Sequence, residues 1–347
     1  MTADKARVAI YGAGAMGTVL GAFLTAGGLK NVDLITRNEQ HVFGLREKGA
    51  RIELSANGGE KCVPVNALFP WEIQGEYDIV FLMTKQRNNA EILEGLLPHI
   101  KNDGIVCTTQ NGLPEESVAK IVGNERTYGA ATSFGATFIG GGMVALTSEI
   151  SAMRMQIGGY QNDGSKLPLL QEILSVIGNE ANNGFVSIEE DLRSARWSKL
   201  AINAAFSGLS VVTGMTFGEV AKKSATRKIA LGILHECMDV ANALGIKLAP
   251  MQGHNLEKVL GGRKGIRRMI SYMVLPIAMK KHKKLVSGML KDVQNGRKCE
   301  IDYINGAVVR EGERVGVETP LCERVVSLVH DIENGLCEID YRNVDFF

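Results

Sequence analysis

The sequence predicts an α/β fold in which an N-terminal, doubly wound parallel sheet is followed by a C-terminal domain built of helices. Apolar strand-like runs alternate with helical patterns along the first part of the chain, which is the order of a parallel sheet with right-handed crossovers. One run, DIVFLM at residues 78–83, is hydrophobic almost throughout, as in a strand buried on both faces. Strand patterns nearly vanish after Glu189, and 347 residues suggest two domains. We therefore expect domains of residues 1–188 and 189–347.

The expected elements follow in order along the chain. Predicted strands in the first domain are residues 7–11, 32–36, 78–83 and 104–109, with helices at 15–26, 39–48 and 88–97. Two further β-like runs, 51–55 and 62–65, flank an Asn-Gly-Gly turn, and glycine-rich β segments extend from about 127 to 157. A helix at 166–177 and a strand at 185–188 close this domain. Predicted helices of the second domain are 192–207, 227–244, 301–315 and 323–332.

Charge and cysteine content exclude several classes of protein. The chain has 39 basic and 38 acidic residues, a formal net charge of +1, which argues against nucleic acid as a partner. No apolar run reaches the about 18 residues of a membrane helix, and the N-terminus has no signal-peptide core. The six cysteines form no CxxC pair and have no histidine at zinc-ligand spacing. We therefore expect free thiols in a reducing cytoplasm, no membrane partner and no metal.

A glycine-rich turn follows the first predicted strand. Gly12-Ala13-Gly14-Ala15-Met16-Gly17 has the pattern GxGxxG, directly after a strand and at the start of a helix. The first glycine permits a tight turn, the second lets the backbone approach a pyrophosphate, and the third lets helix and strand pack closely. The N–H groups at the helix start bind phosphate oxygens. The motif in this context predicts a Rossmann-type dinucleotide site, with a purely structural turn as the alternative.

The end of the second strand indicates which dinucleotide binds. NAD sites usually place Asp or Glu about twenty residues after the glycines, where it binds the ribose hydroxyls. Here that position is Arg37, and arginine suits the 2′-phosphate of NADP through forked, charge-assisted hydrogen bonds. The alternatives are a solvated arginine and, because Glu39 is close in sequence, an NAD-type contact. We expect NADP(H) as the cofactor.

Two polar residues follow later strands, at the edge where ligands bind in such sheets. Lys85 closes the strand of residues 78–83, and Asn111 follows the strand of residues 104–109. An asparagine side chain at that edge can donate to a nicotinamide or substrate oxygen, although Asn-Gly is also a common turn dipeptide. Both residues are therefore candidates for cofactor binding.

A polar stripe marks the first helix of the second domain. Lys199 and Asn203 are spaced i,i+4, and Ser207 follows at i+8, so all three share one helical face. Most of their neighbours are Ala, Ile, Leu or Phe. Burying polar groups there costs free energy unless each has a partner or a ligand. The alternative is an amphipathic helix whose polar face meets water.

These motifs together resemble the ketopantoate reductase family, and the resemblance covers most of the chain in the same order. It rests on the glycine turn, on Lys85, and on three runs: Gln110-Asn111-Gly112, Trp197-x-Lys199-x-x-x-Asn203 and Ser287-Gly288-Met289-Leu290-Lys291-Asp292. The run from Cys299 to Gly306, CEIDYING, completes it. The resemblance implies an NADPH-dependent reductase of 2-oxo acids with an N-terminal Rossmann-type domain, a helical C-terminal domain and an active site between them.

The resemblance also implies roles for individual residues. The family's catalytic lysine matches Lys199, and its acidic residue matches Glu300. Hydride addition to a ketone builds negative charge on the carbonyl oxygen, which an ammonium group both stabilises and protonates. We expect Glu300 to keep that ammonium charged, with a helix-start acid favoured by the dipole as the alternative. Asn203 would bind the substrate, and Lys85 and Asn111 would face the cofactor.

The sequence departs from the family's pattern at two substrate positions. Members often carry a second asparagine two helical turns after the lysine, where this chain has Ser207. The family's Ser-Ser-Met-Leu pattern reads Ser287-Gly288-Met289-Leu290 here, so the serine next to the methionine is missing and Ser287 is its candidate replacement. Ketopantoate is the expected substrate, and a different branched 2-oxo acid is the alternative.

Two other kinds of protein remain as alternatives. A β-hydroxyacid dehydrogenase would carry a substrate loop like DxPVSGG, but the comparable segment here, Ala131 to Ala136, does not match it. We include Ala136, at the end of that segment, among the expected cofactor contacts. A non-catalytic NADP sensor would have no need of a proton donor such as Lys199. A homodimer and a monomer both remain open.

A basic segment from Arg263 to Lys284 contains eight Lys or Arg residues and no acid. We favour a solvated face for it, which is the usual role of a charge run. The alternatives are binding of an acidic or phosphorylated substrate by point charges and a surface for a macromolecular partner.

Overall fold

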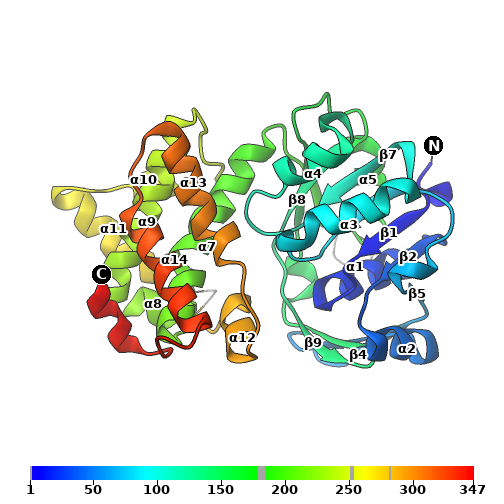
Figure 1. The fold of residues 1–347 in the computed structure, drawn as a ribbon, viewed down its shortest axis with the longest axis horizontal. Coiled ribbons are helices and arrows are strands. Elements are labelled where there is room, and N and C mark those ends of the chain that lie inside the picture. The colour runs from blue at the N-terminus through cyan, green and yellow to red at the C-terminus, as the bar shows by residue number, and fades with distance from the viewer. Residues whose placement is uncertain (1, 179–183, 251–253, 281–282) are drawn as a thin grey trace. The chain divides into compact units, whose positions relative to one another are not determined.

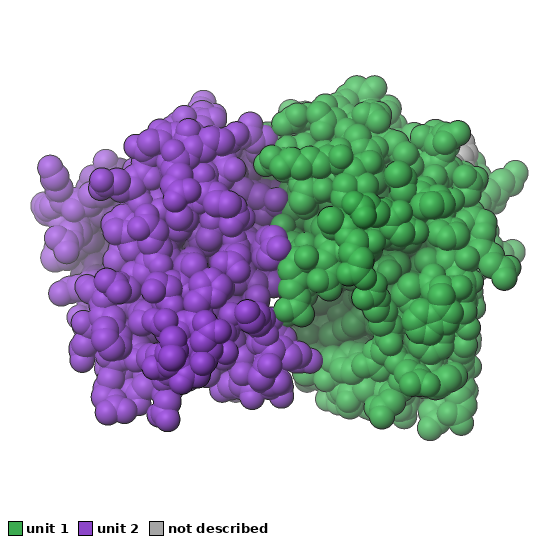
Figure 2. All heavy atoms as spheres, viewed as in Figure 1, with its two compact units in different colours: residues 1–110, 114–192 green, residues 111–113, 193–347 purple. Residues whose placement is uncertain are grey.

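The structure is a computed structural model that describes residues 2–178, 184–250, 254–280 and 283–347. Contacts divide the chain into two compact units (Figure 2). Unit 1 contains residues 1–110 and 114–192, and unit 2 contains residues 111–113 and 193–347. We expected the division after residue 188, and the contacts place it after Leu192, with a short stretch of three residues assigned to the helical unit.

Unit 1 is built on an eight-stranded sheet (Figure 1). Its strand order is β12 (Val186–Ile188), β11 (Met155–Gly159), β8 (Thr127–Thr132), β7 (Ile100–Thr108), β6 (Tyr77–Leu82), β1 (Val8–Tyr11), β2 (Val32–Ile35) and β5 (Asn66–Leu68). All pairings from β8 to β5 are parallel, and β11 pairs with β8 antiparallel. The predicted Rossmann-type sheet is confirmed, with two strands at one end running against the others.

Helices cover both faces of this sheet, which makes it doubly wound. They are α1 (Ala15–Ala26), α2 (Glu39–Lys48), α3 (Asn89–Leu96), α4 (Glu115–Val122) and α5 (Leu167–Ser175). Alternate side chains of β1 face opposite cores: Val8 and Ile10 pack with residues of α1 and α5, and Ala9 and Tyr11 with residues of α3 and α4. All four are buried, as a strand enclosed on both faces requires.

The two helices whose bounds agree with the sequence prediction have clear end signals. For α2, the Asn38 Oδ1 atom accepts a hydrogen bond from the His41 backbone N–H at 2.9 Å. Gly49 ends the helix with φ of 71°, a conformation that favours glycine. The turn glycines start α1 at Ala15. The bounds of short helices of this kind can be predicted from the sequence because particular residue types occur at their ends.

A second, four-stranded sheet lies in the same unit. Its order is β4 (Glu60–Val63), β3 (Ala50–Leu54), β10 (Met143–Leu146) and β9 (Ala136–Gly140). The two β-like runs expected around the Asn-Gly-Gly turn form the antiparallel pair β3–β4, and β10 joins β3 in parallel. The glycine-rich β segments after residue 127 therefore divide between two sheets.

Unit 2 is built of helices around one apolar core. They are α7 (Leu192–Thr213), α8 (Phe217–Lys222), α9 (Ser224–Ala243), α10 (Leu256–Leu260), α11 (Gly265–Ala278), α12 (Gly288–Gln294), α13 (Asn305–Val315) and α14 (Pro320–Glu333). The core contains Trp197 and Phe206 of α7, Leu234 of α9 and Val325 of α14, all buried. The predicted helical domain is confirmed, although α8, α10, α11 and α12 were not among the predicted helices.

The basic segment contains a helix. Most residues of the segment lie in α11. The Lys and Arg residues of the segment that the structure describes are all exposed. Arg263, just before α11, forms an ion pair with Asp239 of α9 at 2.6 Å. The outer face of α11 also exposes Ile266, Met273 and Ile277, which a purely solvated charge run does not predict.

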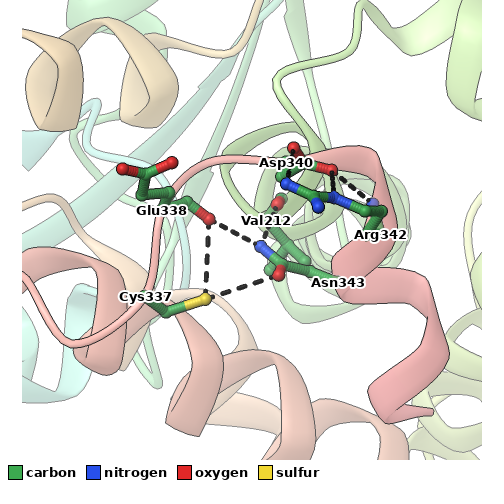
Figure 3. A network of polar contacts seen from close by, with 6 residues as sticks. All are labelled: Val212, Cys337, Glu338, Asp340, Arg342 and Asn343. Atoms are coloured by element: carbon green, nitrogen blue, oxygen red, sulfur yellow. Dashed lines mark hydrogen bonds and ion pairs between the residues drawn. The ribbon is translucent and has the colours of Figure 1, made fainter.

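The end of the chain fastens the C-terminal end of α7 (Figure 3). Asn343 is buried, and its Nδ2 atom donates to the Val212 carbonyl at 2.9 Å and to the Glu338 carbonyl at 2.8 Å. The Asp340 backbone N–H also donates to the Val212 carbonyl, at 3.3 Å. Carbonyls of a last helical turn have no partner within the helix, so these bonds satisfy one of them and hold the helix end in place.

Two general expectations concern the whole chain. All six cysteines are free thiols, as expected from their spacing. Within the described residues, no helix combines the length and the apolar character that crossing a bilayer requires.

Candidate functional site

The glycine turn lies between β1 and α1, and two of its glycines are sterically required. Gly12 has φ of 103°, and a Cβ atom there would lie 2.7 Å from the Met83 carbonyl carbon and from the Thr84 nitrogen. A Cβ atom at Gly17 would lie 2.5 Å from the Gly12 carbonyl oxygen. Real Cβ atoms do not approach backbone so closely, so a side chain at either position forces the turn away from β6 or from the helix.

Gly14 differs from the other two because its missing side chain borders open space. A Cβ atom built there meets no heavy atom within 4 Å. It is the N-cap of α1, has no side-chain cap, and is followed by a first turn with no acidic residue. The first N–H groups of a helix lack partners within it and favour an anion. The residues present therefore fit a pyrophosphate, with Gly14 leaving room for it.

Arg37 lies at the same sheet edge as the glycine turn. In the sheet register, Tyr11 is paired with Ile35 of β2 and with Leu82 of β6, so the residues that follow these three strand ends share one edge. Arg37 is exposed. It is not simply solvated, because its Nη2 atom lies 2.6 Å from the Glu91 Oε1 atom of α3.

A buried amide network organises the loops after β6 and β7. The Gln110 Nε2 atom donates to the Thr84 carbonyl at 2.8 Å and to the Asn89 Oδ1 atom at 2.7 Å. In return, Asn89 donates to the Gln110 Oε1 atom at 3.1 Å and to the Ser117 hydroxyl at 2.9 Å. Gln110 thus fixes the turn that carries Lys85, which is half-buried at the end of β6.

The other two expected cofactor contacts lie in different surroundings. Asn111 directly follows Gln110 and is exposed, and the contacts group it with the helical unit. Ala136 begins β9 in the small sheet, where it is paired with Leu146 of β10. It is half-buried and packs against the core that also contains α1. The structure therefore does not gather all expected cofactor contacts at one strand edge.

The predicted polar stripe lies on one unbroken helix, α7. Lys199 and Asn203 are half-buried, and Ser207 is buried, while Trp197, Leu200, Ala204 and other residues of α7 pack into the core of unit 2. Neighbouring hydroxyls on α7 are used internally: Ser198 donates to the Ser194 and Ala249 carbonyls. Within the described residues, Ser207 has no such bond, which leaves its hydroxyl for a ligand.

Gly208, the residue after Ser207, has a packing role. A Cβ atom there would lie 2.3 Å from the Val325 Cγ1 atom and 2.9 Å from the Asn305 Oδ1 atom. Asn305 is fully buried and donates through Nδ2 to the Ala204 carbonyl of α7 at 3.0 Å. Glycine therefore lets the start of α13 approach the helix that carries Lys199, and it brings the segment that follows Glu300 alongside α7.

Glu300 and Ser287 each begin a helical segment. Glu300 is half-buried and precedes the 3-10 turn Ile301–Tyr303 (η8), and its backbone carbonyl accepts from the N–H of Tyr303 at 3.0 Å. Ser287 is the N-cap of α12, and its hydroxyl oxygen accepts from the Met289 N–H at 3.1 Å. That cap occupies one lone pair of the oxygen, and the hydroxyl hydrogen of Ser287 remains for a substrate carboxylate. A Cβ atom at Gly288 would meet nothing within 4 Å.

Sequence reasoning missed three residues of this region. Gln110 belongs to a run that resembles the family, but the sequence assigns it no role. Asn89 and Glu91 are not among the residues that the sequence predicts for the site. Nothing in the sequence marks them, because their partners are 21 and 54 residues distant along the chain. A buried glutamine at a strand end is a signal only once the neighbouring loops are known.

Comparison with known proteins covers both halves of the chain. Residues 8–160 match the family model described as ketopantoate reductase PanE/ApbA, and residues 191–333 match the model of its C terminal. A 2-dehydropantoate 2-reductase of Lactococcus lactis is 27% identical over 335 residues, which cover 95% of this chain and 99% of the relative. One from Archaeoglobus fulgidus is 24% identical and covers 95% and 99%.

Solved structures agree with this assignment. D-mandelate dehydrogenase in a ternary structure with NADH and anilino(oxo)acetate superposes with a TM-score of 0.79 at 25% identity, covering 95% of this chain and 99% of that one. A 2-dehydropantoate 2-reductase from Geobacter metallireducens has a TM-score of 0.78 at 26% identity, covering 94% and 99%. The family consists of NADP-dependent oxidoreductases. The two matched models span both units in the order expected, and the chain belongs to the ketopantoate reductase family.

Proposed function

We propose that this protein uses NADPH to reduce a 2-oxo acid to the 2-hydroxy acid, with 2-dehydropantoate (ketopantoate) as the leading substrate and pantoate as the product. The observation that carries the proposal is the polar stripe of α7, where Lys199, Asn203 and Ser207 share one face of a helix that is otherwise packed in an apolar core. Ser207 is buried and Lys199 and Asn203 are half-buried, so the stripe loses contact with water, a cost that a bound polar ligand would offset. The 2-dehydropantoate 2-reductases among the relatives support the same substrate.

The cofactor is assigned to the residues of the glycine turn and the neighbouring strand ends. Gly12, Gly14 and Gly17, with Ala13, Ala15 and Met16 between them, hold the pyrophosphate through backbone N–H groups. Arg37 binds the 2′-phosphate. Lys85 and Asn111 are assigned to the rest of the cofactor on the strength of the family resemblance, and Ala136 is kept as a further expected contact. NADPH, when bound, supplies the hydride.

The residues of unit 2 carry the proton chemistry and bind the substrate. The Lys199 ammonium stabilises the negative charge that grows on the carbonyl oxygen and then donates a proton to it. Glu300 keeps Lys199 charged. Asn203 and Ser207 orient the substrate by hydrogen bonds from the same helical face, and the Ser287 hydroxyl hydrogen is a further candidate for the carboxylate. A donor of this kind is typically worth 10²–10⁴ in rate.

Turnover with and without Lys199 tests the proposal. NADPH oxidation is followed with ketopantoate and a panel of branched 2-oxo acids for the unaltered protein, for Lys199→Ala and for Lys120→Ala, an exposed lysine on α4 as the control. We expect turnover to fall by at least about a hundredfold in Lys199→Ala, with NADPH affinity unchanged, and no effect in the control. Near-normal turnover in Lys199→Ala would remove this lysine from the mechanism. Tight NADPH binding with no turnover across the whole panel would favour the sensor alternative.

The departures at Ser207 and Gly288 favour a second candidate substrate class. Ser207 is a shorter polar group than the family's asparagine, and Gly288 lacks the hydroxyl of the family's serine, so the chain differs from the family at two positions assigned to the substrate. The D-mandelate dehydrogenase neighbour, solved with anilino(oxo)acetate, supports including aryl 2-oxo acids in the panel. A higher kcat/KM for phenylglyoxylate than for ketopantoate would establish that alternative.

Assembly and location are further parts of the proposal. A structural neighbour from Staphylococcus aureus is described as a dimeric ketopantoate reductase, and we propose a homodimer here too, which sedimentation at micromolar concentration tests. Six free thiols suit a reducing cytoplasm.

A further inference from the structure

Three residues from three elements of unit 1 meet beside the glycine turn. Tyr11 ends β1, Arg37 follows β2, and Glu91 lies in the first turn of α3. The Arg37 Nη2 atom and the Glu91 Oε1 atom are 2.6 Å apart. Burial raises the pKa of the Tyr11 phenol, the nearby Arg37 opposes the rise, and Glu91 adds to it. The Glu91 carboxylate therefore lies next to the arginine that is assigned to bind the 2′-phosphate of the cofactor.

The ion pair is exposed, and this decides how it can act. The side chains of Arg37 and Glu91 are 58% and 66% exposed. Pairs of this kind contribute little to stability because both charges remain well solvated. Either side chain can therefore leave this ion pair and bind another partner at little cost in free energy. Neither residue is needed to hold the fold.

The two nicotinamide cofactors make opposite demands on such a pair. NADH presents ribose hydroxyls, which sites of this fold usually bind with an Asp or Glu placed after the second strand. That acid is absent here, because the position is Arg37. NADPH presents a 2′-phosphate, which attracts Arg37 and is repelled by any carboxylate next to it.

We propose that Glu91 supplies the missing ribose carboxylate from α3, so that the protein binds NADH as well as NADPH and Glu91 limits its preference for NADPH. With NADH, Glu91 accepts a hydrogen bond from a ribose hydroxyl, and the ion pair between Arg37 and Glu91 is kept. With NADPH, Arg37 turns to the 2′-phosphate, and the Glu91 charge then lies beside a group of the same sign. Glu39, the nearest acid in sequence, is exposed in the first turn of α2, and Arg37 is paired with Glu91 instead.

Direct cofactor binding tests this inference, which rests on the cofactor part of the proposed function and not on its substrate. Dissociation constants of NADPH and NADH are measured by calorimetry for the unaltered protein and for Glu91→Gln, Arg37→Gln and Glu94→Gln. Glu94 is the matched control, since it is an exposed glutamate on the same helix. Because no ketone is present, failure to reduce any 2-oxo acid leaves this test unaffected.

The expected result is a change in selectivity rather than a general loss of binding. The unaltered protein should bind both cofactors, and Glu91→Gln should raise the preference for NADPH over NADH by about five- to tenfold, as expected for removing one close like charge. Higher salt should reduce that difference. Arg37→Gln should weaken NADPH alone, and Glu94→Gln should change neither constant by more than about twofold.

Three outcomes would overturn the inference. The first is an unaltered protein that binds NADPH but not NADH. The second is an NADPH to NADH ratio that is the same in Glu91→Gln as in the unaltered protein. The third is weaker NADPH binding in Glu91→Gln, which would show that Glu91 orients Arg37 toward the phosphate instead of competing with it.

Discussion

Gln110 and Asn89 exchange two side-chain hydrogen bonds, with Gln110 Nε2 donating to Asn89 Oδ1 at 2.7 Å and Asn89 Nδ2 donating to Gln110 Oε1 at 3.1 Å. Both residues are buried. Because Gln110 also donates to the Thr84 carbonyl, this pair connects the end of β7 to the turn before Lys85 and to the start of α3. The pair therefore fixes the loop that carries Lys85, an assigned cofactor contact, and the start of the helix that carries Glu91.

Replacing Gln110 by Met keeps the volume and removes these bonds. The Asn89 amide and the Thr84 carbonyl would lose a buried partner, so we expect the free energy of unfolding to fall by about 1–3 kcal/mol. We also expect KM for NADPH to rise while kcat changes less, because the loops would still form but would be less well fixed. Urea unfolding and steady-state kinetics measure the two effects. Gln40→Met is the control, since Gln40 is exposed on α2.

Replacing glycine by alanine should have different effects at two positions of the glycine turn. Gly12→Ala places a methyl group 2.7 Å from backbone atoms of Met83 and Thr84 at φ of 103°, so the turn must shift and unit 1 should lose stability. Gly14→Ala places it in open space, so the fold should tolerate it while NADPH binding weakens. Thermal unfolding without cofactor and calorimetric NADPH binding separate the two. A Gly14→Ala protein with normal NADPH affinity would contradict the assigned pyrophosphate position.

Local signals allowed much of unit 1 to be predicted from the sequence. The bounds of α1 and α2 follow from glycine and asparagine at their ends, and β6 follows from a hydrophobic run that only a doubly covered strand needs. The reversed direction of β11 and β12 had no such signal, because strand direction depends on which strand is the neighbour in space. The helix α11 was not predicted because the segment was interpreted as a charge run, yet only two of its basic residues, Arg267 and Arg268, lie within the helix, whose other positions are mainly apolar.

The same distinction between local and long-range signals applies to the residues of the candidate site. Lys199, Asn203 and Ser207 could be placed together because one helix fixes their spacing. The Arg37–Glu91 pair and the Gln110 network could not, because they join residues from separate elements whose proximity follows only from the strand order. The capping role of Ser287 could have been anticipated, because serine before a helix start is a common N-cap.

His41 should make unit 1 sensitive to acid. It is fully buried in α2, and its Nδ1 atom accepts from the Gly142 N–H at 3.1 Å, so the neutral ring carries its hydrogen on Nε2 and donates to the Thr18 hydroxyl at 2.9 Å. Burial lowers the pKa of His41 to about 4 from 6.5. Protonation would set a second N–H against the Gly142 N–H.

The sign of the pH effect follows from this lowered pKa. Below pH 6.5 the unfolded chain takes up a proton at His41 that the folded protein refuses until about pH 4, so stability falls as the pH drops through this window and then levels off. The full loss is about 3 kcal/mol. Urea unfolding of the unaltered protein and of His41→Gln between pH 7 and 4.5 measures it. The variant should be less stable at pH 7 but should lose less on acidification, and equal pH slopes would contradict the assignment.

Gly288 offers a direct test of how the substrate carboxylate is held. It is exposed at the start of α12, directly after the cap Ser287, and a Cβ atom there has open space around it. Gly288→Ser therefore restores the hydroxyl of the Ser-Ser-Met-Leu pattern without a clash, and Gly288→Ala adds the same Cβ atom without the hydroxyl. If ketopantoate is the substrate, we expect kcat/KM for it to rise about fivefold in the serine variant, the effect of one added hydrogen bond. The alanine variant should stay near the unaltered value. Equal changes in both variants would trace the effect to the stiffer helix start, and a fall confined to the serine variant would indicate that the site has adapted to a different 2-oxo acid.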